Sequence, residues 1–235
     1  MNKYLTISTV LILFIACSSN EDKMTLTGNV KGLKKGTLLL QKIQDSLLVS
    51  VDSVLVNGNS LFSFKETILE PEIYYLNVRL ENGILKDDRI SFFAESNPIN
   101  ISTTLTNFAI DAKVTGSNNQ EKYKTYKKII DRYSDRNLEL IEQIFEAKKK
   151  GNDSLAIKLN SHQNSILAKK YLATISFALS NKDFEISPYL MVSRVNDTKL
   201  VYLDSVYNNL TPKIKDSKYG KDLESLIVSR KKLEN

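Results

Sequence analysis

The chain has 235 residues, of which 42% are hydrophobic and 26% charged, and it carries a formal net charge of +6. These values are typical of a globular protein and exclude a disordered, collagen-like or coiled-coil chain. The single cysteine excludes an internal disulfide framework and a Cys-x-x-Cys redox pair, and the single histidine excludes a multi-histidine metal centre. The absence of tryptophan removes the strongest stacking platform for sugars or bases.

Residues 1–16 are predicted to be a secretory signal peptide that is not part of the fold. Lys3 supplies a positive charge, and the mostly apolar run Leu5–Ala16 follows it. This run is shorter than the roughly 20 apolar residues that a membrane-spanning helix needs, but it suits a signal peptide. An uncleaved membrane anchor is the alternative interpretation.

The signal ends in Leu13-Phe14-Ile15-Ala16-Cys17, which resembles the lipobox of bacterial lipoproteins. Phe14 departs from the aliphatic residue that is usual at its position. In such proteins the cysteine sulfur receives diacylglycerol and the signal is cut before the cysteine. The motif therefore predicts lipidation of Cys17. Since two or more acyl chains anchor a protein stably, membrane lipid is expected as a partner and the cell envelope as the location. Residues 17–23 are then expected to form a polar tether. The simpler alternative to a lipobox is an ordinary signal peptide that happens to contain a cysteine.

Residues 24–117 are predicted to form an antiparallel β-sandwich or open barrel. Short apolar or alternating runs are separated by turn residues such as Asn57-Gly58-Asn59 and Asn82-Gly83, and this spacing favours a sandwich. The expected strands are Thr25–Val30, Thr37–Gln41, Leu47–Val56, Leu61–Phe64, Ile73–Leu80, Arg89–Ala94, Pro98–Leu105 and Ala112–Val114.

Residues 118–235 are predicted to be α-helical, so that the fold class is α+β. A first helix ends at Lys148-Lys149-Lys150-Gly151, and Asn152-Asp153-Ser154 can cap a second, antiparallel helix. The expected apolar faces are Tyr123, Tyr126, Ile130, Tyr133, Ile141, Ile144 and Phe145 in the first helix, and Leu155, Leu159, His162 and Ile166 in the second.

Three further helices are expected near the C-terminus. Ser187 and Pro188 are predicted to begin a helix over Tyr189–Val195, and Asp197 or Thr198 to cap one over Lys199–Asn208. A last helix over Gly220–Leu233 is expected to turn Leu223, Leu226, Ile227 and Leu233 inward.

The two halves differ in charge. Residues 17–117 carry 10 Lys/Arg and 12 Asp/Glu, a net charge of −2, whereas residues 118–235 carry 22 and 15, a net charge of +7. A basic helical half can contact anionic lipid or an acidic partner, or it can simply be a solvated surface. No interleaving of aromatic and basic residues of the RNA-binding kind is present, so nucleic acid is not expected as a partner.

Several motifs occur together in an order that is known from one protein family. The motifs are Gly28-Asn-Val30 with Gly32-Leu33, Val51-Asp-Ser-Val54, Asn57-Gly58 with Phe62-Ser-Phe64, Pro71-Glu-Ile-Tyr74-Tyr75-Leu76, Phe92-Phe-Ala-Glu95 and Val114-Thr-Gly-Ser117. They resemble the domain of unknown function that precedes the thioredoxin-like domain in TlpA/ResA-type thiol–disulfide oxidoreductases of Bacteroidota, and the resemblance covers most of residues 24–230. Because thiol–disulfide exchange needs a thiolate and a resolving thiol, the single cysteine implies an anchored accessory module without that chemistry.

Other chemistry-bearing residues give weaker signals. His162 is expected to be structural, and Asp87-Asp88 either ligate calcium or lie in a solvated loop. Asp-Ser-apolar triplets at Ser46, Ser53, Ser154 and Ser205 resemble the O-glycosylation acceptors of Bacteroidota. No phosphate-binding loop, Ser/His/Asp set or HExxH motif is present, so no catalytic residue, metal ligand or cofactor-binding residue is assigned.

These observations predict a lipid-anchored envelope protein without an enzymatic activity. It would act as a binding or scaffold module for an envelope protein, associated with a thiol–disulfide oxidoreductase system. The alternative is a surface lipoprotein that binds a glycan, a peptide or a small hydrophobic molecule. A deep aromatic pocket between the two halves would favour the alternative, and a filled interface would favour the scaffold.

Overall fold

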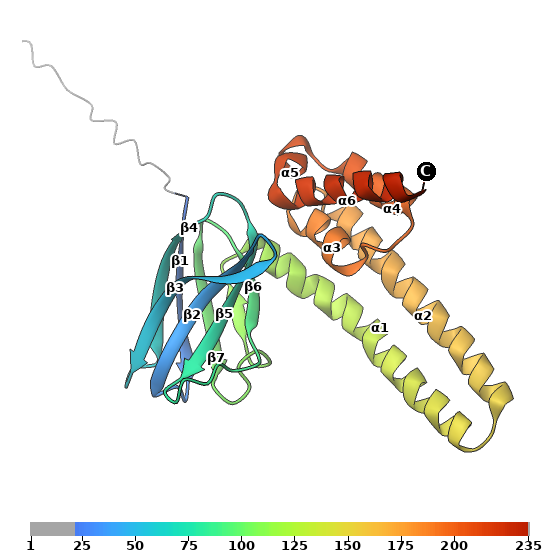
Figure 1. Cartoon of the computed structure of the whole chain (residues 1–235), viewed down its shortest axis with the longest axis horizontal. Coiled ribbons are helices and arrows are strands. Elements are labelled where there is room, and N and C mark those ends of the chain that lie inside the picture. The colour runs from blue at the N-terminus through green and yellow to red at the C-terminus, as the bar shows by residue number, and fades with distance from the viewer. Residues whose placement is uncertain (1–21, 235) are drawn as a thin grey trace, which may run out of the picture.

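The computed structural model describes residues 22–234, so the predicted signal peptide and Cys17 lie outside the described residues. The chain forms eight strands followed by six helices in this part (Figure 1). They are β1 (Lys23–Lys31), β2 (Lys35–Gln44), β3 (Leu47–Asn57), β4 (Leu61–Thr67), β5 (Glu72–Leu80), β6 (Ile90–Ala94), β7 (Pro98–Thr104), β8 (Lys113–Thr115), α1 (Asn118–Lys149), α2 (Asp153–Ser180), α3 (Ile186–Arg194), α4 (Leu200–Asn209), α5 (Pro212–Asp216) and α6 (Lys218–Glu234).

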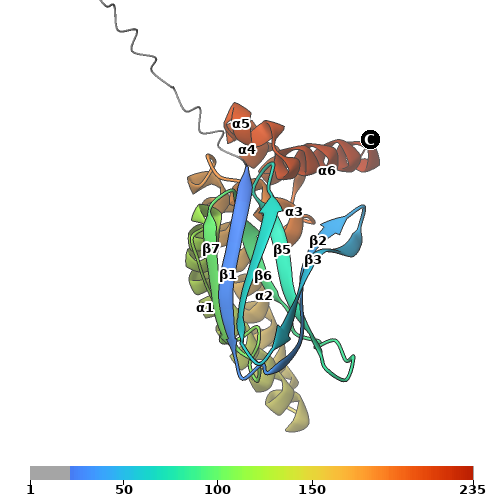
Figure 2. The same ribbon diagram turned by 90° about the vertical axis from the view of Figure 1, so that its left-hand side faces the viewer.

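The strands form two four-stranded sheets that face each other, as Figure 2 shows from the side. The strand order is β4-β1-β7-β8 in one sheet and β3-β2-β5-β6 in the other. The predicted α+β class with an N-terminal β-sandwich is therefore confirmed. One strand pair differs from the antiparallel expectation. The chain crosses from β6 in one sheet to β7 in the other, and β7 runs parallel to β1 there.

The sandwich core is built from alternating side chains on the inner faces of both sheets. In β1, Met24, Leu26 and Val30 point inward, and in β5 Tyr74 and Leu76 do the same. Gly28 occupies the inward position between Leu26 and Val30, where the ring of Phe62 from β4 lies over the strand. This period of two is the pattern that the sequence showed.

The helical half consists of a long hairpin, α1 and α2, with α3 to α6 packed at its base (Figure 1). Ser117 caps α1 by accepting a hydrogen bond from the Gln120 N–H, and Asn152 caps α2, as predicted, by accepting one from the Leu155 N–H. The far end of the hairpin extends away from the other elements, so Ile141 and Phe145 are exposed instead of buried as expected. No helix in residues 22–234 is both long and apolar enough to cross a membrane.

Several predicted helix ends and faces are wrong. Ser187 does not cap α3, because its hydroxyl donates to the carbonyl of Ala178 in α2, and α3 begins at Ile186. Neither Asp197 nor Thr198 caps α4, which begins after Lys199. In α6, Leu233 is 83% exposed and is not turned inward as expected. The short helix α5 was not predicted.

Candidate functional site

An aromatic cluster joins the sandwich to the helices. The ring of Phe93, on the outer face of β6, is fully buried. It packs edge-on against Tyr123 of α1, Tyr189 of α3 and Tyr219 of α6, with ring centroids 6.1, 5.3 and 6.4 Å apart. These distances are typical of favourable aromatic pairs. In residues 22–234 these rings therefore fill the space around Phe93 and leave no deep aromatic pocket there. Two further cavities between the halves, of about 560 and 350 Å³, have no aromatic side chain in their linings.

Side chains from the helices also satisfy backbone groups of the sheet. The Phe93 N–H donates to the side-chain oxygen of Gln120 at 3.1 Å, and the Ile73 N–H donates to the hydroxyl of Tyr219 at 2.9 Å. Buried backbone groups need such partners. Both bonds join the β5–β6 edge of the sheet to helices that lie far from it in the sequence.

A buried polar network is the third set of contacts between the sandwich and the helices. The Asn119 amide nitrogen donates to Glu95, in the β6–β7 turn, at 2.9 Å and to Glu185, before α3, at 2.8 Å. The oxygen of the same amide accepts from the Ile186 N–H at 2.9 Å. Glu95 also accepts from Ser117 and from backbone N–H groups at the start of α1, where the helix dipole favours an anion. These carboxylates are engaged in holding three segments together.

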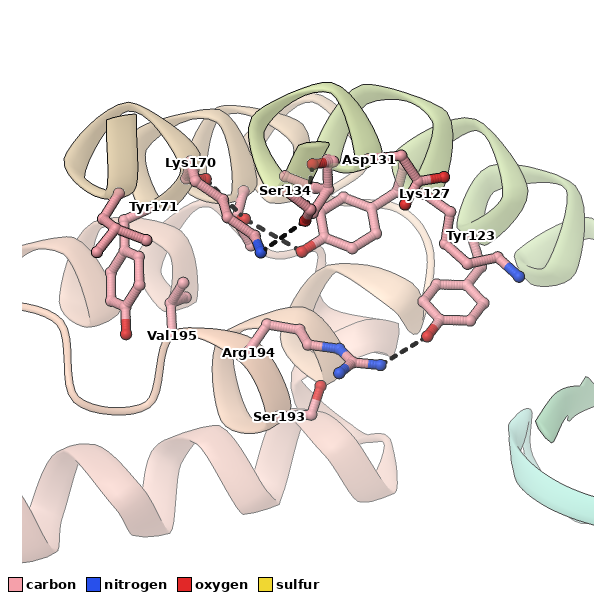
Figure 3. A pocket seen from close by; sticks show the side chains of 13 residues that line it. Tyr123, Lys127, Asp131, Ser134, Lys170, Tyr171, Ser193, Arg194 and Val195 are labelled. Carbon is pink, nitrogen blue, oxygen red and sulfur yellow. Dashed lines mark hydrogen bonds between the residues drawn. The ribbon is translucent and has the colours of Figure 1, made fainter. Parts of the chain in front are cut away.

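Three cationic side chains line one cavity within the helical half, which we name the basic pocket. It encloses about 490 Å³, within the range of about 300–1,000 Å³ that is typical of small-molecule sites. Its lining comes from α1, α2 and the end of α3, as Figure 3 shows. The lining residues are Tyr123, Tyr126, Lys127, Ile130, Asp131, Ser134, Leu167, Lys170, Tyr171, Thr174, Ser193, Arg194 and Val195.

Three cations line the basic pocket. The Lys170 ammonium donates to the Ser134 hydroxyl at 2.9 Å, and the Arg194 guanidinium donates to the Tyr123 hydroxyl at 2.7 Å (Figure 3). The Lys127 ammonium lies 5.2 Å from the centre of the Tyr123 ring. Within residues 22–234, none of these three cations forms an ion pair with a carboxylate.

The tyrosines of the basic pocket do not offset this positive charge. Burial raises the pKa of Tyr126, whose hydroxyl shares a hydrogen bond of 3.1 Å with Thr174. Burial opposes the charge of Arg194, but the phenols of Tyr123 and Tyr189 raise the pKa of Arg194 overall. Arg194 therefore keeps its positive charge, and Asp131 is the one carboxylate in the lining. The pocket is suited to an anion.

A second cavity adjoins the basic pocket on the other side of α2, and we name it the apolar groove. It encloses about 600 Å³. At the boundary between the two cavities, the Tyr171 hydroxyl donates to Asp197 at 2.9 Å. The groove is lined by Leu167, Ala168, Tyr171, Leu172, Ile175, Asp197, Thr198, Lys199 and Tyr202.

The serines of the Asp-Ser-apolar triplets lie apart from one another and from both cavities. Ser46 lies in the β2–β3 turn, where Asp45 and Ser46 adopt left-handed backbone angles. Ser53 lies in β3, Ser154 in the first turn of α2 and Ser205 within α4. The first three are exposed, and Ser205 is half-buried.

The remaining predicted residues do not form a site. His162 is exposed on α2, not packed on an apolar face. Partial burial opposes the charge of Asp88, but the Ala109 N–H and the Lys86 ammonium hold the pKa of Asp88 below its ordinary value. Among residues 22–234, no group of three or more His, Cys, Asp or Glu side chains is arranged to hold a metal ion. Asp88 thus takes part in a structural contact.

The charged residues of the basic pocket were not singled out from the sequence, although Tyr123, Tyr126 and Ile130 in its lining were expected on the apolar face of the first helix. Lys127, Lys170 and Arg194 come from three helices, and no spacing in the sequence relates them. The net charge of +7 in residues 118–235 was the available signal, and it could not distinguish a pocket from a solvated surface.

Comparison with known protein families gives a match over the sandwich and the start of α1. Neither a curated protein nor a solved structure matches the chain. Residues 24–123, from the first strand of the sandwich to the second turn of α1, match the model of a protein family described as a domain of unknown function (DUF4369).

Proposed function

We propose that this protein is a non-catalytic binding module of the cell envelope, anchored through lipidated Cys17, whose helical half binds an anionic ligand in the basic pocket. The signal-like run before Cys17 supports the anchor. Mass spectrometry of the protein from envelope fractions should find a diacylglyceryl-modified N-terminal cysteine. An unmodified cysteine in the mature chain would contradict the anchor.

The observation that carries the binding function is the convergence of Lys127, Lys170 and Arg194 without a carboxylate partner. Like charges that gather around one cavity repel each other, and an anion would relieve this repulsion. Arginine presents a planar fork of donors that matches carboxylate and phosphate oxygens. The cavity is also large enough for a small molecule.

Calorimetric titration of the full chain with inorganic phosphate and with acetate tests this function. We expect each anion to bind, and the double variant Lys170→Gln/Arg194→Gln to weaken binding at least about tenfold, because each hydrogen bond between charged groups contributes about 1.5–3 kcal/mol. Lys169→Gln removes a neighbouring exposed cation of α2 that does not line the basic pocket, and it should leave binding unchanged. Equal affinities in the double variant and the wild type would contradict the proposal.

A second proposed function is a scaffold for a thiol–disulfide oxidoreductase, as the family resemblance implies. The close packing of the aromatic cluster between the halves supports it, and so does the end of the helical hairpin. There, Leu138, Ile141 and Phe145 of α1 form an apolar stripe at helical spacing and are 57%, 45% and 66% exposed. An oxidoreductase with a Cys-x-x-Cys pair should copurify with the wild type but not with Leu138→Gln/Phe145→Gln. Val201→Gln, at an exposed position on α4, is the control, and capture of the enzyme by all three proteins alike would refute the stripe as its site.

A further inference from the structure

The basic pocket and the apolar groove are neighbours across the surface of one helix. Leu167 and Tyr171 of α2 line both cavities. They are four residues apart, so they lie one above the other and form a ridge along the helix. Lys170 and Thr174 face the basic pocket on one side of this ridge. On the other side, Ala168, Leu172 and Ile175 face the apolar groove.

The apolar groove differs from the basic pocket in chemistry. Its α2 wall consists of aliphatic side chains and the ring of Tyr171. Leu172 is 50% exposed and Leu167 is 37% exposed, so apolar surface remains open to solvent there. The polar residues Asp197, Thr198 and Lys199 belong to the opposite wall, between α3 and α4. The Asp197 carboxylate is engaged by the Tyr171 hydroxyl.

We propose that the two cavities form one binding site for an anionic amphiphile, namely a single acyl or alkyl chain with a carboxylate or phosphate head group. The head group binds between Lys170 and Arg194, and the chain crosses the ridge of Leu167 and Tyr171 into the apolar groove. This inference rests on the proposed binding of an anion in the basic pocket, and it names the class of ligand.

Charge complementarity determines where the head group binds. The Lys170 and Arg194 side chains point into the same space between the α1–α2 hairpin and α3 (Figure 3). The Ser134 and Tyr123 hydroxyls that they contact are neutral, so both cations can bind an anion without breaking an ion pair. A carboxylate or phosphate would receive hydrogen bonds from the two cations together. A neutral head group would leave their charges unbalanced.

The walls of the apolar groove favour a hydrocarbon chain over a peptide. The α2 wall is helical, and the backbone groups of a helix are already paired within it. A peptide in the groove would have to satisfy its own backbone N–H and C=O groups there, whereas a hydrocarbon chain has none. Burial of each methylene is expected to raise the affinity by up to about fourfold.

Calorimetric titration with a series of alkyl carboxylates tests the proposal. The protein is the predicted mature chain, residues 17–235, with Cys17→Ser, so that it carries neither the apolar signal segment nor an acyl group of its own and needs no detergent. Decanoate, kept below the concentration at which it forms micelles, should bind at least tenfold more tightly than acetate. Leu172→Gln should lower the affinity for decanoate at least threefold and leave the affinity for acetate and for inorganic phosphate unchanged. Lys170→Gln/Arg194→Gln should weaken the binding of all three anions.

Two controls accompany this series. Ile157→Gln, at an exposed position of α2 that lines neither cavity, should leave the chain-length dependence unchanged. The unfolding midpoint of every variant is measured without ligand, so that loss of folding is not mistaken for loss of binding. A parallel titration with decyl phosphate shows whether the site prefers a phosphate or a carboxylate head group. Tight binding of either ligand supports the site.

The outcomes separate this inference from the proposed function. If acetate and decanoate bind equally, the amphiphile is excluded while the anion pocket stands. If decanoate binds equally to the wild type and to Lys170→Gln/Arg194→Gln, or if neutral decanol binds as tightly as decanoate, the head-group site is refuted. A short peptide with an apolar residue before its free C-terminal carboxylate should displace decanoate only weakly. Strong displacement would assign the site to a peptide instead.

Discussion

The Tyr219 hydroxyl in α6 accepts a hydrogen bond from the Ile73 N–H in β5, with 2.9 Å between the oxygen and the nitrogen. The two residues are 146 positions apart, and Tyr219 is almost fully buried. This contact ties the last helix of the chain to the outer side of the sandwich. The two halves are therefore expected to stabilise each other.

Tyr219→Phe removes this acceptor and keeps the ring. The buried Ile73 N–H then lacks a partner, so the free energy of unfolding should fall by about 1–3 kcal/mol in urea denaturation. Tyr133→Phe is the matched control, because the Tyr133 hydroxyl has no hydrogen-bond partner among residues 22–234. Equal stability of Tyr219→Phe and the control would mean that the bond contributes nothing.

Asn119→Ala should be more destabilising than Tyr219→Phe. It removes three hydrogen bonds and leaves Glu185 buried without the amide that it contacts. A buried carboxylate that loses its partner costs about 3 kcal/mol or more. Urea denaturation measures the loss, and Asn164→Ala on the exposed surface of α2 serves as the control. A loss below about 1 kcal/mol would show that water replaces the amide.

The fold could be predicted from the sequence because its signals are local. Alternation in β1 and the side-chain oxygen of Asn152 each act within a few residues, and both were interpreted correctly. The errors arose where a distant partner competed for a side chain. Ser187 is a good helix cap by type, but the Ala178 carbonyl takes its hydroxyl. Asp197 is also a good helix cap by residue type, but its carboxylate accepts a hydrogen bond from the Tyr171 hydroxyl and does not cap α4.

The candidate site was beyond such reasoning, because it exists only after the helices pack. Phe92 and Phe93 are adjacent in the sequence and so face opposite sides of β6, which indicates burial on both faces but not what covers the outer one. Likewise, Lys170 is one of many lysines, and only the packing of α1 and α3 against α2 distinguishes it from the exposed Lys169.

Gly28→Ala should destabilise the sandwich. A methyl group at this position would overlap the Ile101 carbonyl of β7 and lie 2.5 Å from the ring of Phe62. Both neighbours are held by strand pairing or core packing, so the overlap should cost about 1–3 kcal/mol. Thermal denaturation should show a lower midpoint for this variant than for Asn29→Ala in the same strand. An unchanged midpoint would mean that β1 and β7 can separate without cost.

The aromatic cluster between the sandwich and the helices should make the protein less stable at alkaline pH. Burial against Tyr123 and its neighbours raises the pKa of Tyr189 from 10.0 to about 12. The folded state holds the Tyr189 proton more tightly than the unfolded state does. The contribution of Tyr189 to the free energy of unfolding is therefore complete below about pH 10 and is lost as the pH rises toward 12. The loss amounts to roughly 2–3 kcal/mol, at about 1.4 kcal/mol for each pH unit of difference. Urea denaturation at intervals from pH 8 to 12 should therefore show a steeper decline for the wild type than for Tyr189→Phe, whereas parallel profiles would contradict the assignment.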